Sequence, residues 1–267
     1  MIKKLSHKWT PRIMAKIIAI KWLVSNIGLV TTATILLEML FGITNNHSIK
    51  FRFLDNTVRM DILSLRTDIA MLTEIFCFEA YEIKEDIKPT LIVDAGANKG
   101  TTSIYFGIKY PVAEIHCYEP NSDLIAILRN HLKINGVNAR VYNEAISDMN
   151  GIKFFEKNEN HQFSKIVEED CGLSVRSVSL NDRYVNKKID ILKLDIEGEE
   201  EKVIDSIDFK NLDIGVIIQE VHYDRVDYEK IFSILRKNDY YFSDPYPQYH
   251  YLNPDVDRPI LLAITKL

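Results

Sequence analysis

From Thr90 onward the sequence alternates apolar runs of strand length with helical patterns, and this alternation constrains the fold more than any other feature. Apolar strands joined through helices form a parallel sheet that is covered by helices on both faces. We therefore predict an α/β fold with a mostly parallel central sheet. The expected strands are TLIVDA, EIHCYE, ARVYNEAIS, IDILKLDIEG, DIGVIIQEVH, YYFSD and RPILLAITKL. Between ARVYNEAIS and residue 189 we expect an irregular segment.

The N-terminal region has a different residue pattern from the rest of the chain. After a basic start, residues 17–43 are largely apolar, but the uncharged run from Trp22 to Leu37 is short and contains serine, asparagine and threonine. A spanning helix needs about 20 apolar residues. Three interpretations stay open: a helix docked on the domain, an interfacial helix lying on a membrane, and a membrane span or signal.

Residues 47–62 alternate apolar and polar side chains on both sides of Asp55-Asn56, which predicts a β-hairpin with this pair at its tip. Residues 66–81 then place apolar side chains at helical spacing, with Thr67 or Asp68 as the N-terminal cap. These two elements precede the first strand of the sheet.

Composition excludes some classes of function. The formal net charge of −5 and the pI near 5.8 give no electrostatic footprint for nucleic acid. The cysteines, Cys77, Cys117 and Cys171, are widely spaced and form no C-x-x-C pair, so a disulfide framework or zinc site is not indicated. We expect reduced thiols in a cytoplasmic protein, and the N-terminal segment leaves peripheral membrane contact open.

The loop in IVDAGANKG (92–100) indicates a nucleotide cofactor. A nicotinamide-binding turn would read G-x-G-x-x-G, but here only Gly96 and Gly100 remain and Asp94 ends the strand. A carboxylate at this point repels a pyrophosphate and suits the ammonium and sulfonium groups of S-adenosylmethionine. Glu119, at the end of the second strand, is placed to accept hydrogen bonds from both ribose hydroxyls.

Several motifs together resemble the FkbM family of S-adenosylmethionine-dependent methyltransferases. They are TDIAMLTEIFCFEAY, VDAGANKG, CYEPN, NEAISD followed by NG, VSLNDRYVNKKIDILKLDIEGEE and QEVH, in the family's order over roughly residues 60–245. The resemblance implies a Rossmann-like class I methyltransferase fold. With the patterns described above, we expect three segments: a hydrophobic N-terminal helical segment (1–46), which lies outside the resemblance, the hairpin and helix (47–89), and an S-adenosylmethionine-binding domain (90–267).

The resemblance assigns cofactor-binding roles to individual residues. The methionyl end of the cofactor would be lined by Asp94, Gly96, Asn98 and Gly100, the ribose would be held by Glu119 with Asn121 close by, and the adenine would be bordered by Ile146, Ser147 and Asp148. Asp148-Met149-Asn150-Gly151 also has a plain interpretation as a turn, which Asn-Gly favours.

Two acidic pairs follow later strands. Asp195 and Glu197 leave the strand that contains ILKL, ahead of Gly198 and a helix whose early glutamates (199–201) are first-turn charges. Glu220 and His222 end the next strand, and a histidine is the side chain best suited to accept a proton near neutral pH. We predict catalytic roles for Asp195, Glu197, Glu220 and His222, with Asp195 also near the cofactor. A structural histidine, and a divalent cation held by these four residues, remain alternatives.

The family's usual activity implies O-methylation of a hydroxyl on a sugar, a glycan or another small metabolite. Two other classes of function stay open. One is a non-catalytic nucleotide-binding protein of the same fold, and the other is a nicotinamide-dependent oxidoreductase, which the missing glycine and Asp94 disfavour.

Overall fold

The computed structural model describes residues 2–43, 45–158, 164–220, 226–243 and 260–265. The described chain forms two compact units, residues 2–82 and residues 83–243 with 260–265.

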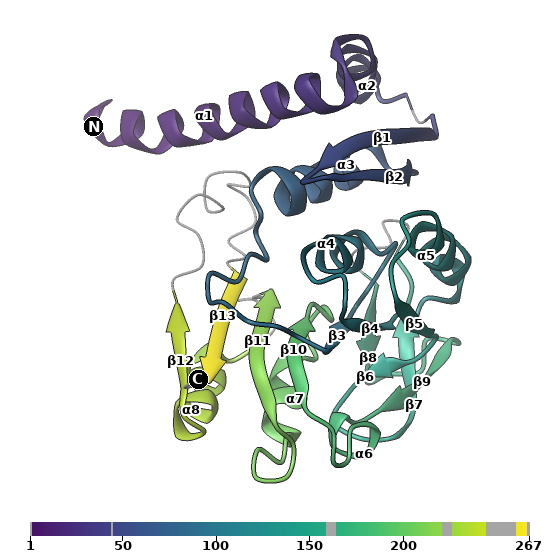
Figure 1. The fold of residues 1–267 in the computed structure, drawn as a ribbon, viewed down its shortest axis with the longest axis vertical. Coiled ribbons are helices and arrows are strands. Elements are labelled where there is room, and N and C mark those ends of the chain that lie inside the picture. Colours follow the sequence, from purple (N-terminus) through teal and green to yellow (C-terminus); the bar gives the residue numbers. More distant parts are fainter. Residues whose placement is uncertain (1, 44, 159–163, 221–225, 244–259, 266–267) are drawn as a thin grey trace. The chain divides into compact units, whose positions relative to one another are not determined.

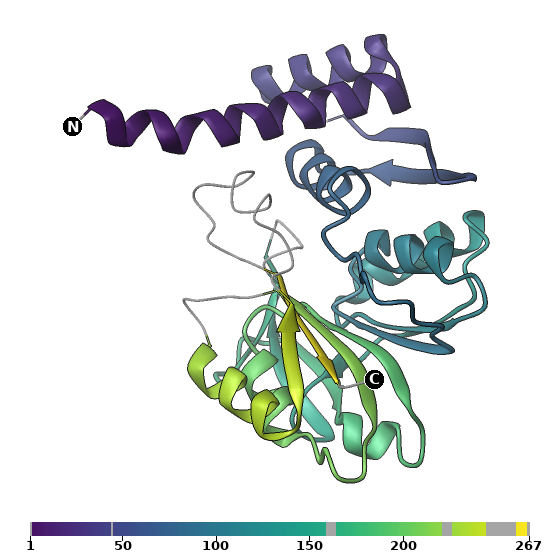
Figure 2. The ribbon, with the colours of Figure 1, turned by 60° about the vertical axis from the view of Figure 1, so that its left-hand side comes forward.

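The N-terminal unit begins with two helices where the sequence shows one apolar segment. α1 (Ile2–Ile27) ends at Gly28, whose φ of 91° breaks the helix, and α2 (Leu29–Phe41) follows directly. The two helices pack against each other (Figure 2). On its inner side α1 contacts the hairpin, with Trp22 against the ring of Phe51. None of the helices within the described ranges combines the length and the apolar content that crossing a membrane requires.

The predicted hairpin is confirmed, with a tip one residue earlier than expected. β1 (His47–Phe53) pairs antiparallel with β2 (Asn56–Ile62), and Phe53 lies opposite Asn56. The tip is therefore Leu54-Asp55, and Leu54 takes a positive φ of 51°. This register puts the apolar side chains of both strands on one buried face, which a shift by one residue would reverse.

The helix expected at 66–81 begins earlier and ends sooner. α3 (Leu65–Leu72) starts after Ser64, and Asp68 accepts hydrogen bonds from the backbone N–H groups of Leu63 and Ser64. Its last turn widens into the π-helical η1 (Thr73–Cys77).

The second unit is built on a seven-stranded sheet with the order β12-β13-β11-β10-β3-β4-β5 (Figure 1). Five neighbouring strands are parallel, and β13 is antiparallel to both of its neighbours. The strands are β3 (Leu91–Ala95), β4 (Glu114–Tyr118), β5 (Ala139–Tyr142), β10 (Ile189–Leu194), β11 (Ile214–Glu220), β12 (Tyr240–Ser243) and β13 (Ile260–Thr265). The predicted mostly parallel sheet is confirmed.

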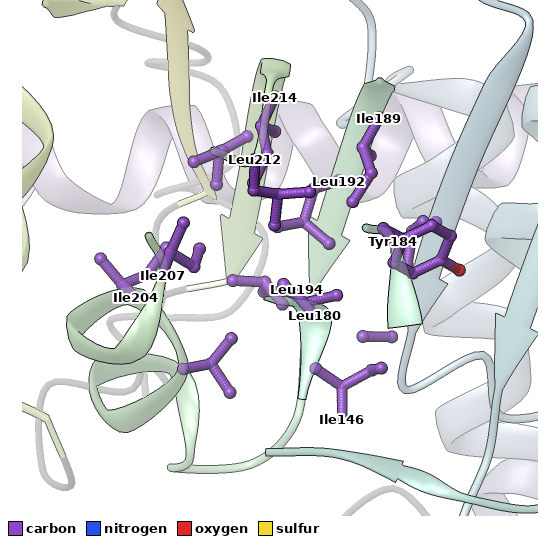
Figure 3. Close-up of a cluster of buried hydrophobic side chains, with 14 of the residues drawn as sticks. Ile146, Leu180, Tyr184, Ile189, Leu192, Leu194, Ile204, Ile207, Leu212 and Ile214 are labelled. Carbon is purple, nitrogen blue, oxygen red and sulfur yellow. The ribbon is translucent and has the colours of Figure 1, made fainter. Parts of the chain in front are cut away.

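Helices cover both faces of this sheet (Figure 2). One face carries α4 (Thr101–Lys109) and α5 (Ser122–Ile134), and the other carries α6 (Leu180–Arg183), α7 (Glu200–Ser206) and α8 (Tyr228–Lys237). Side chains from β10, β11, α6 and α7 pack together between the sheet and the helices of the second face. Figure 3 shows Leu180, Leu192, Leu194 and Ile204 in this cluster. The chain's order reverses between β3 and β10, and ligands of open α/β sheets bind at such a switch point, outside the carboxyl ends of the strands.

The middle of the chain differs from the sequence prediction. ARVYNEAIS is not one strand, because β5 ends at Tyr142 and the Asn143 side chain turns to donate hydrogen bonds to the carbonyls of Glu119 and Pro120. The expected irregular segment contains three strands of a second sheet of order β6-β9-β7-β8, whose fourth strand, β6, lies within ARVYNEAIS. Its strands are β6 (Ala145–Ile146), β7 (Gly151–Glu156), β8 (Lys165–Val167) and β9 (Ser174–Val178). β7, β8 and β9 are short and only partly buried, so they lack the continuous apolar runs that indicate the strands of the main sheet.

Candidate active site

The glycine loop that follows β3 crosses closely over the end of β10. Gly96 has a φ of 79°, and a Cβ placed on it would lie 1.8 Å from the backbone oxygen of Asp195. The backbone N–H groups of Gly96 and Ala97 both donate to the carbonyl of Tyr118, at the end of β4. Gly100, with a φ of 88°, precedes the first turn of α4. The loop is therefore held by β3, β4 and β10 together. Position 96 must be glycine because the backbone of Asp195 leaves no room for a Cβ.

Asp94, predicted to line the methionyl end of the cofactor, is fully buried beneath this loop. Its Oδ2 accepts a hydrogen bond of 2.5 Å from the Ser103 hydroxyl in α4, and its Oδ1 lies 3.1 Å from Nζ of Lys193. Its Oδ2 is therefore hydrogen-bonded, whereas its Oδ1 has the Lys193 ammonium as an ion partner and makes no hydrogen bond. In this arrangement it supports the loop from below.

Lys193 is the centre of the buried charges, although it is not among the site residues predicted from the sequence. Its Nζ donates to the carbonyl of Gly96 at 2.9 Å and lies 3.4 Å from Oδ2 of Asp195. Burial alone lowers the pKa of Lys193, but the carboxylates of Asp94 and Asp195 outweigh it and raise the pKa above its usual value. The ammonium is therefore charged and ties the glycine loop to the end of β10. A lysine inside the apolar strand ILKL was the signal that could have identified it.

Glu119, the predicted ribose ligand, lies at the end of β4 and is buried. Its Oε2 accepts from the backbone N–H of Asn98 at 2.8 Å, and its Oε1 accepts from that of Asn121 at 2.7 Å. Burial raises the pKa of Glu119 to about 7, against the two backbone hydrogen bonds, which lower it. The structure thus brings together three predicted cofactor residues, with the carboxylate held in one orientation.

Asn121 precedes the first residue of α5. Its side chain accepts a hydrogen bond from the backbone N–H of Asp123, which is the geometry of an N-terminal cap. Asn98, in the glycine loop, takes a positive φ of 49°, and its half-buried side chain has an Oδ1 without a hydrogen-bond partner. An amide oxygen of this kind is available to a ligand.

The three residues predicted to border the adenine lie at the end of β6. The Ser147 hydroxyl is 2.9 Å both from Oδ1 of Asp148 and from Oε2 of the buried Glu199. Asp148 also pairs with Lys153, and although burial raises the pKa of Asp148, this pairing and the Ser147 hydrogen bond lower it overall. Ile146 belongs to the buried hydrophobic cluster (Figure 3).

The loop after β10 is shaped by a buried glutamate. β10 ends at Leu194, so the strand does not continue through Asp195 and Glu197, and Glu197 takes a positive φ of 56°. Glu200 accepts hydrogen bonds from the backbone N–H groups of Ile196 and Gly198, both at 2.9 Å. The glutamates at 199–201 lie in or next to the first turn of α7, as expected. Glu200, however, is fully buried, and its two hydrogen bonds fix the loop.

The remaining predicted catalytic residues lie at and beyond the end of β11. Glu220 is half-buried in the last position of the strand, and its charge contributes to the raised pKa of Lys193. His222 lies outside the described residues. Within the described ranges no three histidine, cysteine or acidic side chains gather in a way that could hold a metal ion. Which of these residues accepts the proton therefore stays a prediction.

Comparison with known families settles the class of this protein. A family model described as the methyltransferase FkbM domain matches residues 94–242, which is more than half of the 267 residues. The chain belongs to this family. The match begins at Asp94 and ends in β12, so it contains every predicted site residue. The resemblance inferred from the motifs is confirmed, and methyltransferase is the activity to which the family points.

Two curated relatives carry names of the same kind. Methyltransferase 1 of Beauveria bassiana (strain ARSEF 2860) is 22% identical over an alignment that covers 71% of this chain and 87% of that protein. Methyltransferase sdnD of Sordaria araneosa is 28% identical, with 51% of this chain and 67% of that protein covered. Among solved structures, methyltransferase FkbM from Methylobacillus flagellatus KT is 15% identical over 75% of this chain and 54% of that chain, with a TM-score of 0.47.

Proposed function

We propose that this protein transfers a methyl group from S-adenosylmethionine to a hydroxyl group of a sugar, a glycan or another small metabolite. The observation that carries the cofactor assignment is the setting of Glu119. Its buried carboxylate is oriented by two backbone N–H groups beside a glycine loop, at the switch point of the sheet. Such a carboxylate can accept hydrogen bonds from the two hydroxyls of a ribose.

The charges around the loop favour S-adenosylmethionine over a dinucleotide. Lys193 is buried and paired with Asp94 and Asp195, so it is not presented to a pyrophosphate. Asp195 is about one quarter exposed, which leaves it the accessible carboxylate of that cluster. We assign the methionyl ammonium to Asp195 and give Asp94 a supporting role beneath the loop. The cofactor, when bound, supplies a methyl group on a positively charged sulfur.

The chemistry required of the chain is positioning and removal of a proton. The acceptor oxygen attacks the methyl carbon, a C–O bond forms as the C–S bond breaks, and S-adenosylhomocysteine leaves. The hydroxyl proton passes to a side chain near the carboxyl ends of β10 and β11. Asp195, Glu220 and His222 are the candidates, and Glu197 lies in the same loop as Asp195.

Calorimetric titration tests the cofactor assignment without knowledge of the acceptor. We expect S-adenosylmethionine and S-adenosylhomocysteine to bind and NAD⁺ not to bind. Glu114→Gln is a matched control for substitutions of Glu119, because Glu114 starts β4 at the opposite edge of the sheet, where it pairs with Arg140. Binding of NAD⁺ but of neither sulfur compound would overturn the proposal.

Turnover tests the transfer itself. Release of S-adenosylhomocysteine is measured with a panel of sugars, glycans and small hydroxyl compounds. If His222 is the proton acceptor, His222→Ala lowers the rate by roughly 10² to 10⁴ with little change in cofactor affinity. Asp195→Asn lowers both the rate of turnover and the affinity for the cofactor. Cofactor binding without turnover on any acceptor would instead favour a non-catalytic binding protein of this fold.

We also propose a cytoplasmic location. Cys77, Cys117 and Cys171 are free, and Cys171 is exposed. An exposed free thiol suits a reducing compartment. Cell fractionation checks this proposal, and secretion of the protein with an oxidised Cys171 would contradict it.

A further inference from the structure

The N-terminal unit exposes an unusual number of apolar side chains on α1 and α2. On α2 the exposed fractions of five of them run from 54% to 80%, and on α1 those of five more run from 41% to 54%. They are Leu29, Val30, Leu37, Leu40 and Phe41 on α2, and Ile13, Met14, Ile17, Ile18 and Ile20 on α1. We refer to these ten residues as the apolar face. Exposed apolar side chains in this number, on two helices that contact each other, indicate a site of interaction.

α2 has five apolar side chains exposed and its charged side chain buried, which is the reverse of a normal surface helix. At 100° per residue, Thr32, Ile35 and Glu38 point to one side, and all three are buried. Leu29, Leu40 and Phe41 point away from that side. The helix thus directs its charged residue, Glu38, inward, where its oxygens contact Asn45 and His47. A helix exposed to water along its length would carry its polar residues outside.

The charged residues of α1 are all basic. The sequence has no acidic residue before Glu38, and α1 contains six basic residues: Lys3, Lys4, Lys8, Arg12, Lys16 and Lys21. Lys16 and Lys21 are exposed next to the apolar side chains of α1. The chain as a whole carries a net charge of −5, so this basic segment contrasts with the remainder.

We propose that α1 and α2 bind the surface of a membrane that contains anionic lipid, with the apolar face in the boundary between headgroups and acyl chains. Helices with a broad apolar side and flanking lysines lie in this boundary, held by apolar burial and by attraction to anionic headgroups. The charge argues against a second copy of the chain as the occupant. Pairing of two identical faces would bring the basic residues of both α1 helices together, whereas an anionic lipid surface complements them.

Vesicle flotation tests the proposal on the 267-residue chain. Vesicles of phosphatidylcholine alone are compared with vesicles that contain roughly 30% phosphatidylglycerol. We expect the protein to float with the anionic vesicles at least ten-fold more strongly than with the neutral ones. Raising the salt from about 0.1 M to about 1 M should weaken this binding, because the lysine contribution is screened.

Substitutions separate the apolar and the electrostatic parts. Leu40→Gln with Phe41→Gln removes apolar area and keeps helix propensity, and should lower binding to anionic vesicles at least ten-fold. Lys16→Glu with Lys21→Glu should lower it by more than ten-fold and abolish the preference for anionic lipid. Val112→Gln with Ile152→Gln is the matched control, since these side chains are 80% and 69% exposed in the other unit. The control should bind like the unmodified chain.

Three outcomes would overturn the proposal. They are the absence of flotation by the unmodified chain, equal binding by the α2 variant, and equal loss in the control. Light scattering during chromatography adds a further check, since a dimer that Phe41→Gln dissociates, without vesicle binding, would identify the face as a self-association surface. Circular dichroism verifies that each variant is folded. None of these measurements depends on methyl transfer, so the proposal stands or fails separately from the proposed function.

Discussion

The two units of this chain distribute apolar and charged side chains in opposite ways. The N-terminal unit turns Leu40 and Phe41 outward, and its α2 buries its single charged residue, Glu38. The methyltransferase unit buries Asp94 and Lys193 under its glycine loop. Apolar surface in water and charge in a protein interior are both unfavourable unless a partner compensates.

The difference lies in where the compensating partner is found. For the buried charges the partners are inside the same unit, because Lys193 meets Asp94, Asp195 and the carbonyl of Gly96. For the apolar face we propose a partner outside the chain. Partners inside the unit hold the buried charges in one geometry, so removing one partner should destabilise the fold. A partner outside the chain leaves the apolar side chains exposed in the free protein, so replacing them should change the free energy of unfolding very little.

The largest effect is expected from breaking the internal compensation at Lys193. Lys193→Met leaves the fully buried carboxylate of Asp94 without its ion partner, and should lower the free energy of unfolding by about 3 to 5 kcal/mol. Denaturant unfolding followed by circular dichroism measures this. Adding Asp94→Asn should restore a substantial part of the loss, because the uncompensated charge is then gone.

Lys157→Met is the control for that substitution. Lys157 pairs with the exposed carboxylate of Asp123, and an ion pair of this kind contributes about 0 to 1 kcal/mol. If Lys193→Met costs no more than Lys157→Met, the buried cluster does not hold the unit together.

The next largest effect is expected at Gly96. In Gly96→Ala the new Cβ collides with the backbone of Asp195, which cannot move aside as a side chain would. We expect a loss of about 3 kcal/mol or more in unfolding free energy and loss of S-adenosylmethionine binding in calorimetry. Gly136→Ala shares the positive φ but has open space around its Cβ, so it should cost only about 1 kcal/mol. Equal losses in the two variants would show that backbone conformation alone matters at Gly96.

A smaller effect is expected at Glu119, where ligand binding and protonation are coupled. Glu119→Gln should weaken S-adenosylmethionine binding by about 1 to 3 kcal/mol, the scale of a hydrogen bond to a charged group. Calorimetric titration measures this, with Glu114→Gln as the control. Unchanged affinity would remove Glu119 from the site.

The pH dependence of the same binding tests the environment of Glu119. Burial raises the pKa of Glu119 to about 7, above the ordinary carboxyl value of 4.5. The raised pKa favours the folded state below about pH 4.5, and this contribution is lost as the pH rises to about 7. Ribose hydroxyls donate most strongly to the ionised carboxylate, so cofactor affinity should rise with pH through about 7. Glu119→Gln should remove this rise, and a rise that persists would place the titrating group elsewhere.

The smallest effect is expected on the apolar face. Leu40→Gln or Phe41→Gln should change the unfolding free energy of the N-terminal unit by less than about 0.5 kcal/mol, because neither side chain is buried. Ile35→Ala, in the buried side of the same helix, should cost about 2 to 5 kcal/mol. Both tryptophans, Trp9 and Trp22, belong to this unit, so their fluorescence reports its unfolding. A large loss from Phe41→Gln would mean that the face is already covered within the chain.

The sequence by itself determined the elements whose signals are local. Apolar runs of strand length separated by helical patterns indicated the parallel sheet. The glycines of the loop after β3 were recognisable because a turn with positive φ needs them. The motifs in this region also sufficed to identify the family. These features depend on residues that are neighbours along the chain.

Only the tertiary structure decided which distant residues meet. The pairing of Asp94 with Lys193, and the contact that requires glycine at position 96, both depend on the register of β10 against β3. The Gly28 break that divides the apolar N-terminal segment into two helices, and the second sheet formed by β6 to β9, also lay beyond the sequence patterns. The physical reason is the same throughout. Periodicity reports which side of an element is buried, but the partner on that side is set by packing between segments about 100 residues apart.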